Sequence, residues 1–263
     1  MTPRRPSAPH ATDAARFFDR DAVRYDASYA DGSPVGHTLR ARLAVTLDLL
    51  GDGGGSVLDA GMGPGRLCAE LARRGFAVSG VDASSEMVAI ARSRVPEAAE
   101  RLLQSNLEDL PFASESFEAI VATGVLEYLG VIPPALSELA RVLRPGGLAV
   151  LSVPNVKAPY VIWRRAAYYP AIRLLKRRRF HGARPAPFRR RRPPSRTAFV
   201  AMVEAAGLEI ESVRYAAYVV LPSPLDELFP AVTLRIAERL EGSSPRVGSV
   251  LGTQVVLAAR KPG

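Results

Sequence analysis

The chain has 263 residues, a single cysteine and a formal net charge of +9. One cysteine excludes an internal disulfide framework and fits a reducing compartment, and no apolar run reaches the roughly eighteen residues that a membrane span needs. The first residues also lack the apolar stretch of a signal peptide, so we expect a soluble or peripheral protein in the cytoplasm. The length of the chain suits one large domain.

The positive charge is concentrated in one segment. Between Lys157 and Arg196 there are 14 lysines and arginines and no acidic residue, so the rest of the chain has an excess of acidic side chains. Such a block either remains solvated or contacts an anionic partner. Anionic lipid and nucleic acid both satisfy the charge alone.

We expect the single domain, residues 1–263, to begin with a flexible tail and a helical cap. Residues 1–12 are polar and contain proline, and two helical patterns follow within residues 13–50, near 13–28 and 36–50. The core, residues 51–154, alternates strands and helices. Its expected strands lie near 56–59, 77–82, 100–104, 117–123 and 147–153, and its helices near 65–74, 84–93 and 133–143. This alternation predicts a parallel sheet with helices on both faces and ligands at the carboxyl edge of the strands.

The remainder of the chain consists of a basic insert at 155–195 and a C-terminal part at 196–263. The C-terminal part is expected to contain a helix near 197–206, two strands near 208–216 and 253–260, and a second insert at 217–250. Both inserts exceed what a doubly wound sheet needs, and both leave from the half of the chain where such folds build their substrate covers.

The most informative stretch has a strand, loop and helix pattern and runs from Val57 to Leu67. An apolar run ends in Asp59, and glycine then stands at every second position: Gly61, Gly63 and Gly65. Glycine lets the backbone turn sharply and lets a ligand approach where any Cβ would collide, and the helix start offers unpaired N–H groups. The dinucleotide fingerprint would require glycine at position 66, where Arg66 stands, so the loop is a poor match to NAD and FAD sites.

A second apolar strand, Ala77–Asp82, ends in an acid about twenty residues after the first glycine. A doubly wound fold places a carboxylate there against ribose hydroxyls, so Asp82 is expected to accept hydrogen bonds from a ribose. Ala83 and Ser84 begin the next helix.

From Phe17 to Val153 the chain resembles the class I S-adenosylmethionine-dependent methyltransferases, and within them the small-molecule group that includes the ubiquinone and menaquinone biosynthesis enzymes. After the glycine loop and Asp82, the family's further motifs stand in order at Gln104–Phe112, Phe117–Thr123, Val125–Leu129 and Arg141–Gly147. Upstream, Phe18-Asp19-Arg20 and Tyr25-Asp26 resemble the family's cap over the cofactor.

The resemblance implies an α/β fold: a doubly wound, seven-stranded, Rossmann-like sheet in the order 3-2-1-4-5-7-6. The last strand would be antiparallel, with an N-terminal helical cap and inserts after strands five and six.

The resemblance also implies the cofactor, S-adenosyl-L-methionine, and the residues that bind it. The glycine loop would admit the methionine part and the ribose, Asp59 would lie near the ammonium group, and Asp82 would take the ribose hydroxyls. Adenine would pack near Ala83, with its edge held by the Asn106 side chain and the Leu107 backbone N–H. Asn106 stands where the family usually has an acid, and it keeps an acceptor oxygen. The full expected set is Asp59, Gly61, Gly63, Gly65, Asp82, Ala83, Asn106, Leu107 and Thr123.

No catalytic residue is assigned. Methyl transfer is an in-line displacement in which the protein mainly holds donor and nucleophile close and aligned, and a base matters only for a hydroxyl or an acidic carbon. The candidates for a base are His37, at the start of the second cap helix, and Glu127 and Tyr128, in the loop beneath the methyl donor. Structural roles are the competing interpretation for all three. Arg66 either meets the methionine carboxylate or is a solvated helix residue, and no metal ion is expected.

The basic insert has an amphipathic helical pattern. Its apolar stripe contains Tyr160, Trp163, Ala167, Ala171 and Leu174, and the opposite side contains Arg165, Arg173 and Lys176. A basic amphipathic helix that bears Trp and Tyr is typical of a segment in a membrane interface, and Pro170 allows a kink.

We therefore expect a methyltransferase that acts on a small, lipophilic acceptor and docks through Tyr160–Arg192 on an anionic membrane surface, at the inner face of the membrane. Two alternatives remain open: an RNA methyltransferase that uses the arginine-rich insert as a phosphate clamp, and a non-catalytic scaffold that binds the cofactor. The sequence leaves the acceptor and the oligomeric state open.

Overall fold

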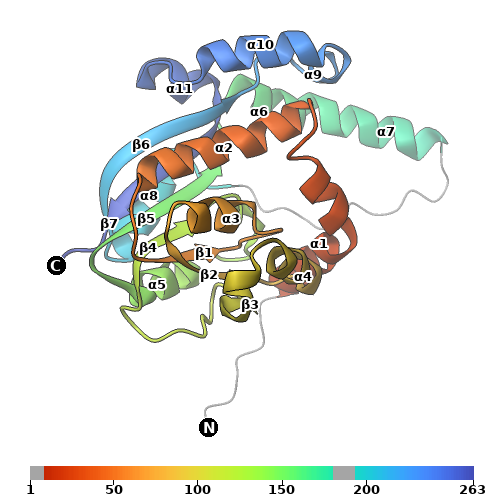
Figure 1. The fold of residues 1–263 in the computed structure, drawn as a ribbon. Coiled ribbons are helices and arrows are strands. Elements are labelled where there is room, and N and C mark those ends of the chain that lie inside the picture. The colour runs from red at the N-terminus through yellow and green to blue at the C-terminus, as the bar shows by residue number, and fades with distance from the viewer. Residues whose placement is uncertain (1–8, 180–192) are drawn as a thin grey trace.

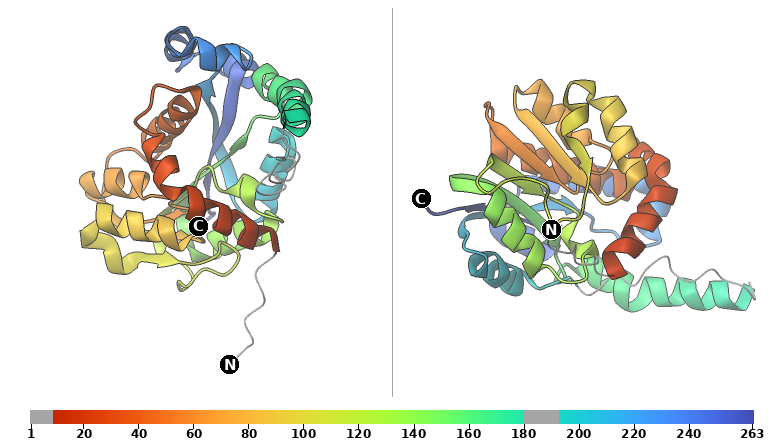
Figure 2. Two further views of the ribbon diagram at one scale, coloured as in Figure 1. Left: turned by 90° about the vertical axis from the view of Figure 1, so that its right-hand side faces the viewer. Right: turned by 90° about the horizontal axis from the view of Figure 1, so that it is seen from below.

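The computed structural model describes the backbone of residues 9–179 and 193–263 and the side chains of residues 13–174 and 193–263. A seven-stranded sheet runs through the centre of the molecule, with helices on both of its faces (Figures 1 and 2). The strand order is β3-β2-β1-β4-β5-β7-β6. This is the expected order. Strand β7 runs antiparallel to both β5 and β6, so the expected antiparallel last strand is also confirmed.

Five parallel strands form the first part of the sheet: β1 (Ser56–Ala60), β2 (Ala77–Asp82), β3 (Leu102–Gln104), β4 (Phe117–Ala122) and β5 (Leu143–Pro154). The C-terminal part adds β6 (Glu209–Tyr218) and β7 (Gly252–Arg260). Strand β3 is shorter than expected because a 3-10 turn, Pro96–Arg101, takes up the start of the predicted strand.

The strands are buried on both faces, and their side chains alternate between two apolar layers. One layer packs under α2 (Pro34–Leu50), α3 (Arg66–Arg73) and α4 (Ser85–Arg94), and it includes Val57, Val121, Val150 and Val256. The other packs under α5 (Pro133–Val142) and α8 (Arg196–Ala205), and it includes Leu58, Ile120, Leu151 and Leu257. This alternation fixes which polar side chains at the strand ends face α2.

The cap begins earlier than expected. Helix α1 spans Pro9–Ala27, so residues 9–12 are helical, and residues 1–8 of the predicted tail lie outside the described residues. Asp19 ties α1 to the start of α4, because its Oδ1 accepts a hydrogen bond from Ser84 Oγ at 2.6 Å. Helix α1 therefore lies across the carboxyl edge of the sheet, where the predicted ligand site is.

The basic insert forms a helical arm. It contains α6 (Pro159–Trp163), a π-helical segment (Arg164–Tyr168) and α7 (Tyr169–Arg179), which projects from the body of the molecule (Figure 2). The π segment ends two residues before Pro170, whose missing N–H interrupts the regular α-helical pattern. Residues 180–192 of the predicted membrane segment lie outside the described residues.

The second insert contains α9 (Leu225–Leu228), α10 (Pro230–Leu240) and α11 (Pro245–Leu251), which lie above α2 and β6 in Figure 1. Both inserts leave from the carboxyl edge of the parallel strands, since β5 and β6 end there. No helix in the described part of the chain is long and apolar enough to cross a membrane.

Candidate active site

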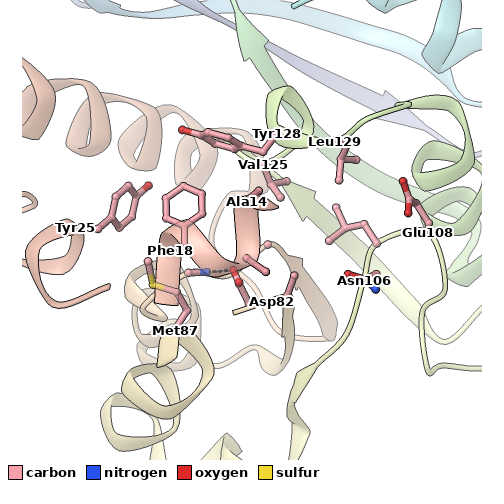
Figure 3. A pocket seen from close by; sticks show the side chains of 16 residues that line it. Ala14, Phe18, Tyr25, Asp82, Met87, Asn106, Glu108, Val125, Tyr128 and Leu129 are labelled. Carbon is pink, nitrogen blue, oxygen red and sulfur yellow. Dashed lines mark hydrogen bonds between the residues drawn. The ribbon is translucent and has the colours of Figure 1, made fainter. Parts of the chain in front are cut away.

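Two adjoining cavities open at the carboxyl edge of the sheet, beneath α1 and α2. The first has about 680 Å³ of empty space, counting its open mouth, and its lining includes Phe18, Tyr25, Gly63, Asp82, Asn106 and Tyr128 (Figure 3). The second is smaller, and its lining includes Tyr29, Arg42, Asp59, Pro64 and Thr123. Tyr25, Gly61, Gly63 and Gly124 line both cavities, so the two adjoin at the glycine loop.

The three glycines of the loop have three different environments. All three have positive φ. A Cβ on Gly61 would lie 2.4 Å from the Val125 side chain, and one on Gly65 would lie 2.8 Å from the Ala91 side chain. A Cβ on Gly63 would meet only Tyr25, at 3.9 Å, and would point into open space. Gly63 is therefore the loop position that faces a ligand, whereas Gly65 lines neither cavity and lets α3 pack on α4.

Asp82 is held in place by the loop that it faces. Its Oδ2 accepts from the Gly63 N–H at 2.9 Å (Figure 3), and its Oδ1 accepts from the Ser84 N–H at 2.9 Å. Burial raises the pKa of Asp82, and these backbone hydrogen bonds oppose that rise. The predicted ribose acceptor is thus oriented before a ligand arrives.

The predicted adenine residues line the far side of the first cavity. Asn106 and Leu107 follow β3, and Ala83 follows β2. Glu108 also lines this cavity, and burial raises its pKa. The two cavities together include every expected cofactor residue except Gly65.

Asp59 and Thr123 lie in the second cavity. The Asp59 side chain is 3% exposed, and burial raises its pKa to about 7, against the opposing effect of the Cys68 thiol, which donates to Asp59 Oδ2 at 3.4 Å. A cationic partner would stabilise the ionised form of such a buried carboxyl group.

Sequence reasoning missed Arg42, which enters the second cavity from α2. Arg42 is 8% exposed, and its guanidinium lies over Gly124, where a Cβ would come within 2.3 Å of Cζ. Burial disfavours its charged form, but the fields of Tyr25, Tyr29 and Glu127 outweigh burial and raise the pKa of Arg42. The signal in the sequence was a charged residue on the apolar side of a helix.

Aromatic side chains roof the cavities. The Phe18 ring packs edge-on against Tyr128 and Tyr25, with centroid distances of 5.1 and 5.7 Å, and Tyr25 packs on Tyr29 at 5.9 Å. Burial raises the pKa of Tyr29. This roof is largely apolar and comes from α1, the turn after it and the loop after β4.

Arg66 has neither of its expected roles. Its Nε donates to Asp26 Oδ1 at 2.7 Å, and its guanidinium lies 5.5 Å from the centre of the Tyr29 ring. Arg94 pairs with the other oxygen of Asp26 at 2.7 Å. Burial would raise the pKa of Asp26, but the two arginines lower it. These contacts fasten the end of α1 to α3 and α4.

The three candidate bases are not brought together. His37 is 6% exposed and lines neither cavity, and its Nε2 lies 3.1 Å from Oε1 of Glu241 at the end of α10. Glu127 is buried and also lines neither cavity. Tyr128 alone among the three lines the first cavity, where it packs on Phe18. His37 therefore joins the cap to the second insert.

Comparison with known proteins gives matches over the middle of the chain. A family model described as a methyltransferase domain matches residues 58–151. Malonyl-[acyl-carrier protein] O-methyltransferase of Salmonella typhimurium is 36% identical over 138 residues, which cover 52% of this chain and 52% of that protein. Demethylmenaquinone methyltransferase of Beutenbergia cavernae is 39% identical over 145 residues, 55% of this chain and 58% of that protein. The chain spans about half the length of these curated relatives, and 26% of a bifunctional biotin biosynthesis protein of Cellvibrio japonicus.

Solved structures share the whole fold at low sequence identity. Geranyl diphosphate C-methyltransferase from Streptomyces coelicolor A3(2) has a TM-score of 0.62 at 18% identity, over 97% of this chain and 99% of that chain. The [4+2]-cyclase SpnF has a TM-score of 0.64 at 21% identity, over 98% of each chain. Because one of these proteins is a cyclase, the fold alone does not specify methyl transfer.

The family match and the cavities coincide in the chain. The match begins at Leu58 in β1 and ends at Leu151 in β5, so it contains the glycine loop, Asp82 and Asn106. Residues 58–151 therefore match a methyltransferase domain, in agreement with the resemblance drawn from the sequence motifs.

Proposed function

We propose that the protein transfers a methyl group from S-adenosylmethionine to a small, lipophilic acceptor at a membrane surface. The observation that carries this proposal is the first cavity, where the Gly63 backbone, Asp82 and Asn106 converge beneath an aromatic roof. The cofactor supplies an electrophilic methyl group on a sulfonium. The protein's residues then have to bind and align the two reactants and exclude water from them.

The second cavity has the charges that an α-amino acid group requires. Asp59 offers a buried carboxyl group and Arg42 a buried guanidinium, and both line the same small space. Buried charged groups are stabilised by a partner of opposite sign, so an ammonium and a carboxylate on one ligand would satisfy both. In this proposal Asp59 takes the ammonium of the methionine part and Arg42 takes its carboxylate.

The first cavity fits the rest of the cofactor. Asp82 would accept from the ribose hydroxyls, since its position is fixed by the Gly63 and Ser84 N–H groups. The Asn106 side chain and the Leu107 N–H would hold the adenine edge, with Ala83 and Met87 packed on its faces.

The lining of the first cavity favours an apolar acceptor. Phe18, Tyr25, Val125 and Leu129 lie there, beyond the polar groups given to the cofactor. Two relatives of this domain are named malonyl-[acyl-carrier protein] O-methyltransferase and demethylmenaquinone methyltransferase. Their names support the general class of small-molecule acceptors. Mostly apolar walls with a few polar groups are typical of sites for such ligands.

The arm supports the membrane part of the proposal. Trp163, Tyr169 and Leu174 are 44%, 48% and 54% exposed, and Arg165 and Arg173 are exposed on the same helical arm. Aromatic and aliphatic side chains beside arginines suit the interface of an anionic membrane, to which each arginine contributes about 1 kcal/mol. Because the arm leaves the end of β5, membrane contact would bring the acceptor near the cavities.

Transfer of labelled methyl from S-adenosylmethionine into a cell extract tests the function. We expect label in the organic-solvent fraction with the wild-type protein and none with Gly63→Val, which blocks the cofactor site. Label in ribonuclease-sensitive material would favour an RNA methyltransferase. No transfer by a wild-type protein that binds the cofactor would favour a scaffold, and either result would overturn the proposal.

A further inference from the structure

The second insert exposes an apolar stripe that the sequence analysis did not single out. Leu225, Leu228, Phe229 and Val232 are 43%, 65%, 56% and 51% exposed, and they lie close together in the sequence on both sides of the helix break at Phe229. They belong to α9, the residue after it and the first turn of α10, at the outer edge of the molecule (Figure 1). Four exposed side chains of this size in one short segment are unusual for a surface without a partner.

Two hydrogen bonds, one buried and one partly buried, join the arm to the segment that carries this stripe. Trp163 Nε1 donates to the Ser223 carbonyl at 2.7 Å, and the Tyr160 hydroxyl donates to Asp226 Oδ2 at 2.6 Å. Asp226 is 1% exposed and Tyr160 is 8% exposed. The arm and the second insert, some sixty residues apart in the sequence, therefore form one unit, with the partly exposed indole of Trp163 beside the stripe.

The charges next to the stripe favour one kind of partner. Arg164 donates to the Tyr160 hydroxyl at 2.9 Å and lies over the Tyr169 ring at 4.9 Å, while Arg165 and Arg173 are exposed farther along the arm. The exposed acid of α9, Glu227, accepts from Tyr168 at 3.5 Å. An apolar stripe bordered by Trp, Tyr and arginine matches the layered chemistry of an anionic bilayer, with acyl chains inside and phosphates outside.

We propose that Leu225, Leu228, Phe229 and Val232 insert into the acyl boundary of an anionic membrane, with Trp163 at the interface and the arginines of the arm on the lipid phosphates. This inference rests on the membrane contact in the proposed function and adds a second, apolar element to it. Since β6 ends just before this insert, insertion would place the carboxyl edge of the sheet against the membrane. The stripe provides the part of the binding that salt does not screen.

The single tryptophan of the chain, Trp163, makes the proposal measurable in the full protein. Vesicles of phosphatidylcholine with phosphatidylglycerol are added, some with brominated acyl chains, and fluorescence and flotation are recorded at low and high salt. We expect a blue shift of Trp163 emission, quenching by the brominated chains, and flotation that persists in part at high salt. With all four stripe residues changed to Ser, we expect at least a tenfold loss of flotation and no quenching.

Controls separate this proposal from the one on which it rests. The matched variant Val23→Ser, Val35→Ser removes exposed apolar side chains from the cap and should float like wild type, and S-adenosylhomocysteine binding should be retained in all variants as a test of folding. If wild type does not float at all, the membrane contact itself fails. If Arg165→Ser, Arg173→Ser abolishes flotation while the stripe variant floats normally, the contact stands and the stripe proposal is overturned. A wild-type dimer that the stripe variant converts to a monomer would make the stripe an interface between two copies and would also overturn it.

Discussion

Two regions at the carboxyl edge of the sheet have opposite chemistry. At the ends of β1, β2 and β4, charged groups are buried, and Asp59 and Arg42 are only 3% and 8% exposed. In the inserts after β5 and β6, large apolar side chains are exposed, and Leu228 and Phe229 reach 65% and 56%. Burying a charge and exposing an apolar side chain both cost free energy. In the proposed function the first region binds a ligand of complementary charge, and the second contacts the apolar part of a membrane.

The two regions also differ in how firmly their side chains are held. Asp82 accepts two backbone hydrogen bonds, and Asp26 pairs with two arginines, so the cofactor region is fixed before binding. The arm is joined to the body through α6, and α7 projects beyond it (Figure 2). We infer that the first region determines which cofactor binds and that the second determines whether the protein associates with a membrane surface. The following variants test the role of the first region in that division.

The largest effect is expected for Gly63→Val. The new side chain would point into the cavity, and the positive φ of residue 63 adds a cost of roughly 1–2 kcal/mol for a residue with a Cβ. We expect the affinity for S-adenosylhomocysteine to fall by more than about a hundredfold, which corresponds to roughly 2.7 kcal/mol. Calorimetric titration measures it. Gly53→Val is the control, because a Cβ there meets no atom within 4 Å, and it should bind like wild type. Normal affinity in a folded Gly63→Val protein would contradict the site.

Arg42→Leu should have the next largest effect. Loss of a hydrogen bond between charged groups costs about 1.5–3 kcal/mol, so we expect a ten- to hundredfold weaker affinity for S-adenosylhomocysteine. Because Arg42 also lies in the fields of the buried Glu127 and Asp59, its loss should lower the melting temperature of the ligand-free protein as well. Arg24→Leu, on the exposed side of α1, serves as the control. Unchanged affinity in Arg42→Leu would show that the methionine carboxylate is held elsewhere.

Asn106 allows a finer test of adenine recognition. Asn106→Leu should lose roughly 1–3 kcal/mol of binding free energy, because it leaves the adenine amino group without an acceptor, whereas Asn106→Asp should preserve or tighten binding. The same titration distinguishes the two. A leucine variant that binds as well as wild type would remove Asn106 from the adenine site.

The pH dependence of binding should report on Asp59. Burial raises the pKa of Asp59 to about 7, so this carboxyl group is largely neutral below that pH and must release its proton to pair with an ammonium. The affinity for S-adenosylhomocysteine should therefore rise with pH up to about 7, by at most about tenfold per pH unit, and level off above it. Titrations at pH 6 in buffers of different ionisation enthalpy should detect proton release. Asp59→Asn should abolish this release, and a release that persists in that variant would assign it to another group.

Much of the fold follows from local patterns in the sequence. The apolar runs that end at Asp59 and Asp82, with helical patterns between them, are sufficient to predict parallel strands and a ligand edge. The helix and strand boundaries were less predictable, as the early start of α1 at Pro9 shows. The π segment before Pro170 depends on how the helix accommodates a proline, and spacing alone does not specify it.

Site residues could be predicted where their place at the end of a strand brings them to the cavity. They could not be predicted where the packing of a helix on the sheet does so. Asp82 follows from its place at a strand end, but Arg42 reaches the cavity only because α2 packs across the sheet at one rotation. Gly65 has the same local pattern as Gly63, and their roles differ because a Cβ on Gly65 would lie 2.8 Å from the Ala91 side chain. The stripe at Leu225–Val232 has the spacing of a buried helix side, so only the three-dimensional structure reveals its exposure.

Titration of S-adenosylhomocysteine into wild type, Asp82→Ala and Asp109→Ala tests the central claim most directly. Asp82 lines the first cavity, whereas Asp109 is exposed and lines neither cavity. We predict one ligand per chain for wild type, at least about tenfold weaker binding for Asp82→Ala, equivalent to roughly 1.4 kcal/mol, and unchanged binding for Asp109→Ala. No binding by wild type, or equal affinity in Asp82→Ala, would contradict the assignment of this cleft to the cofactor.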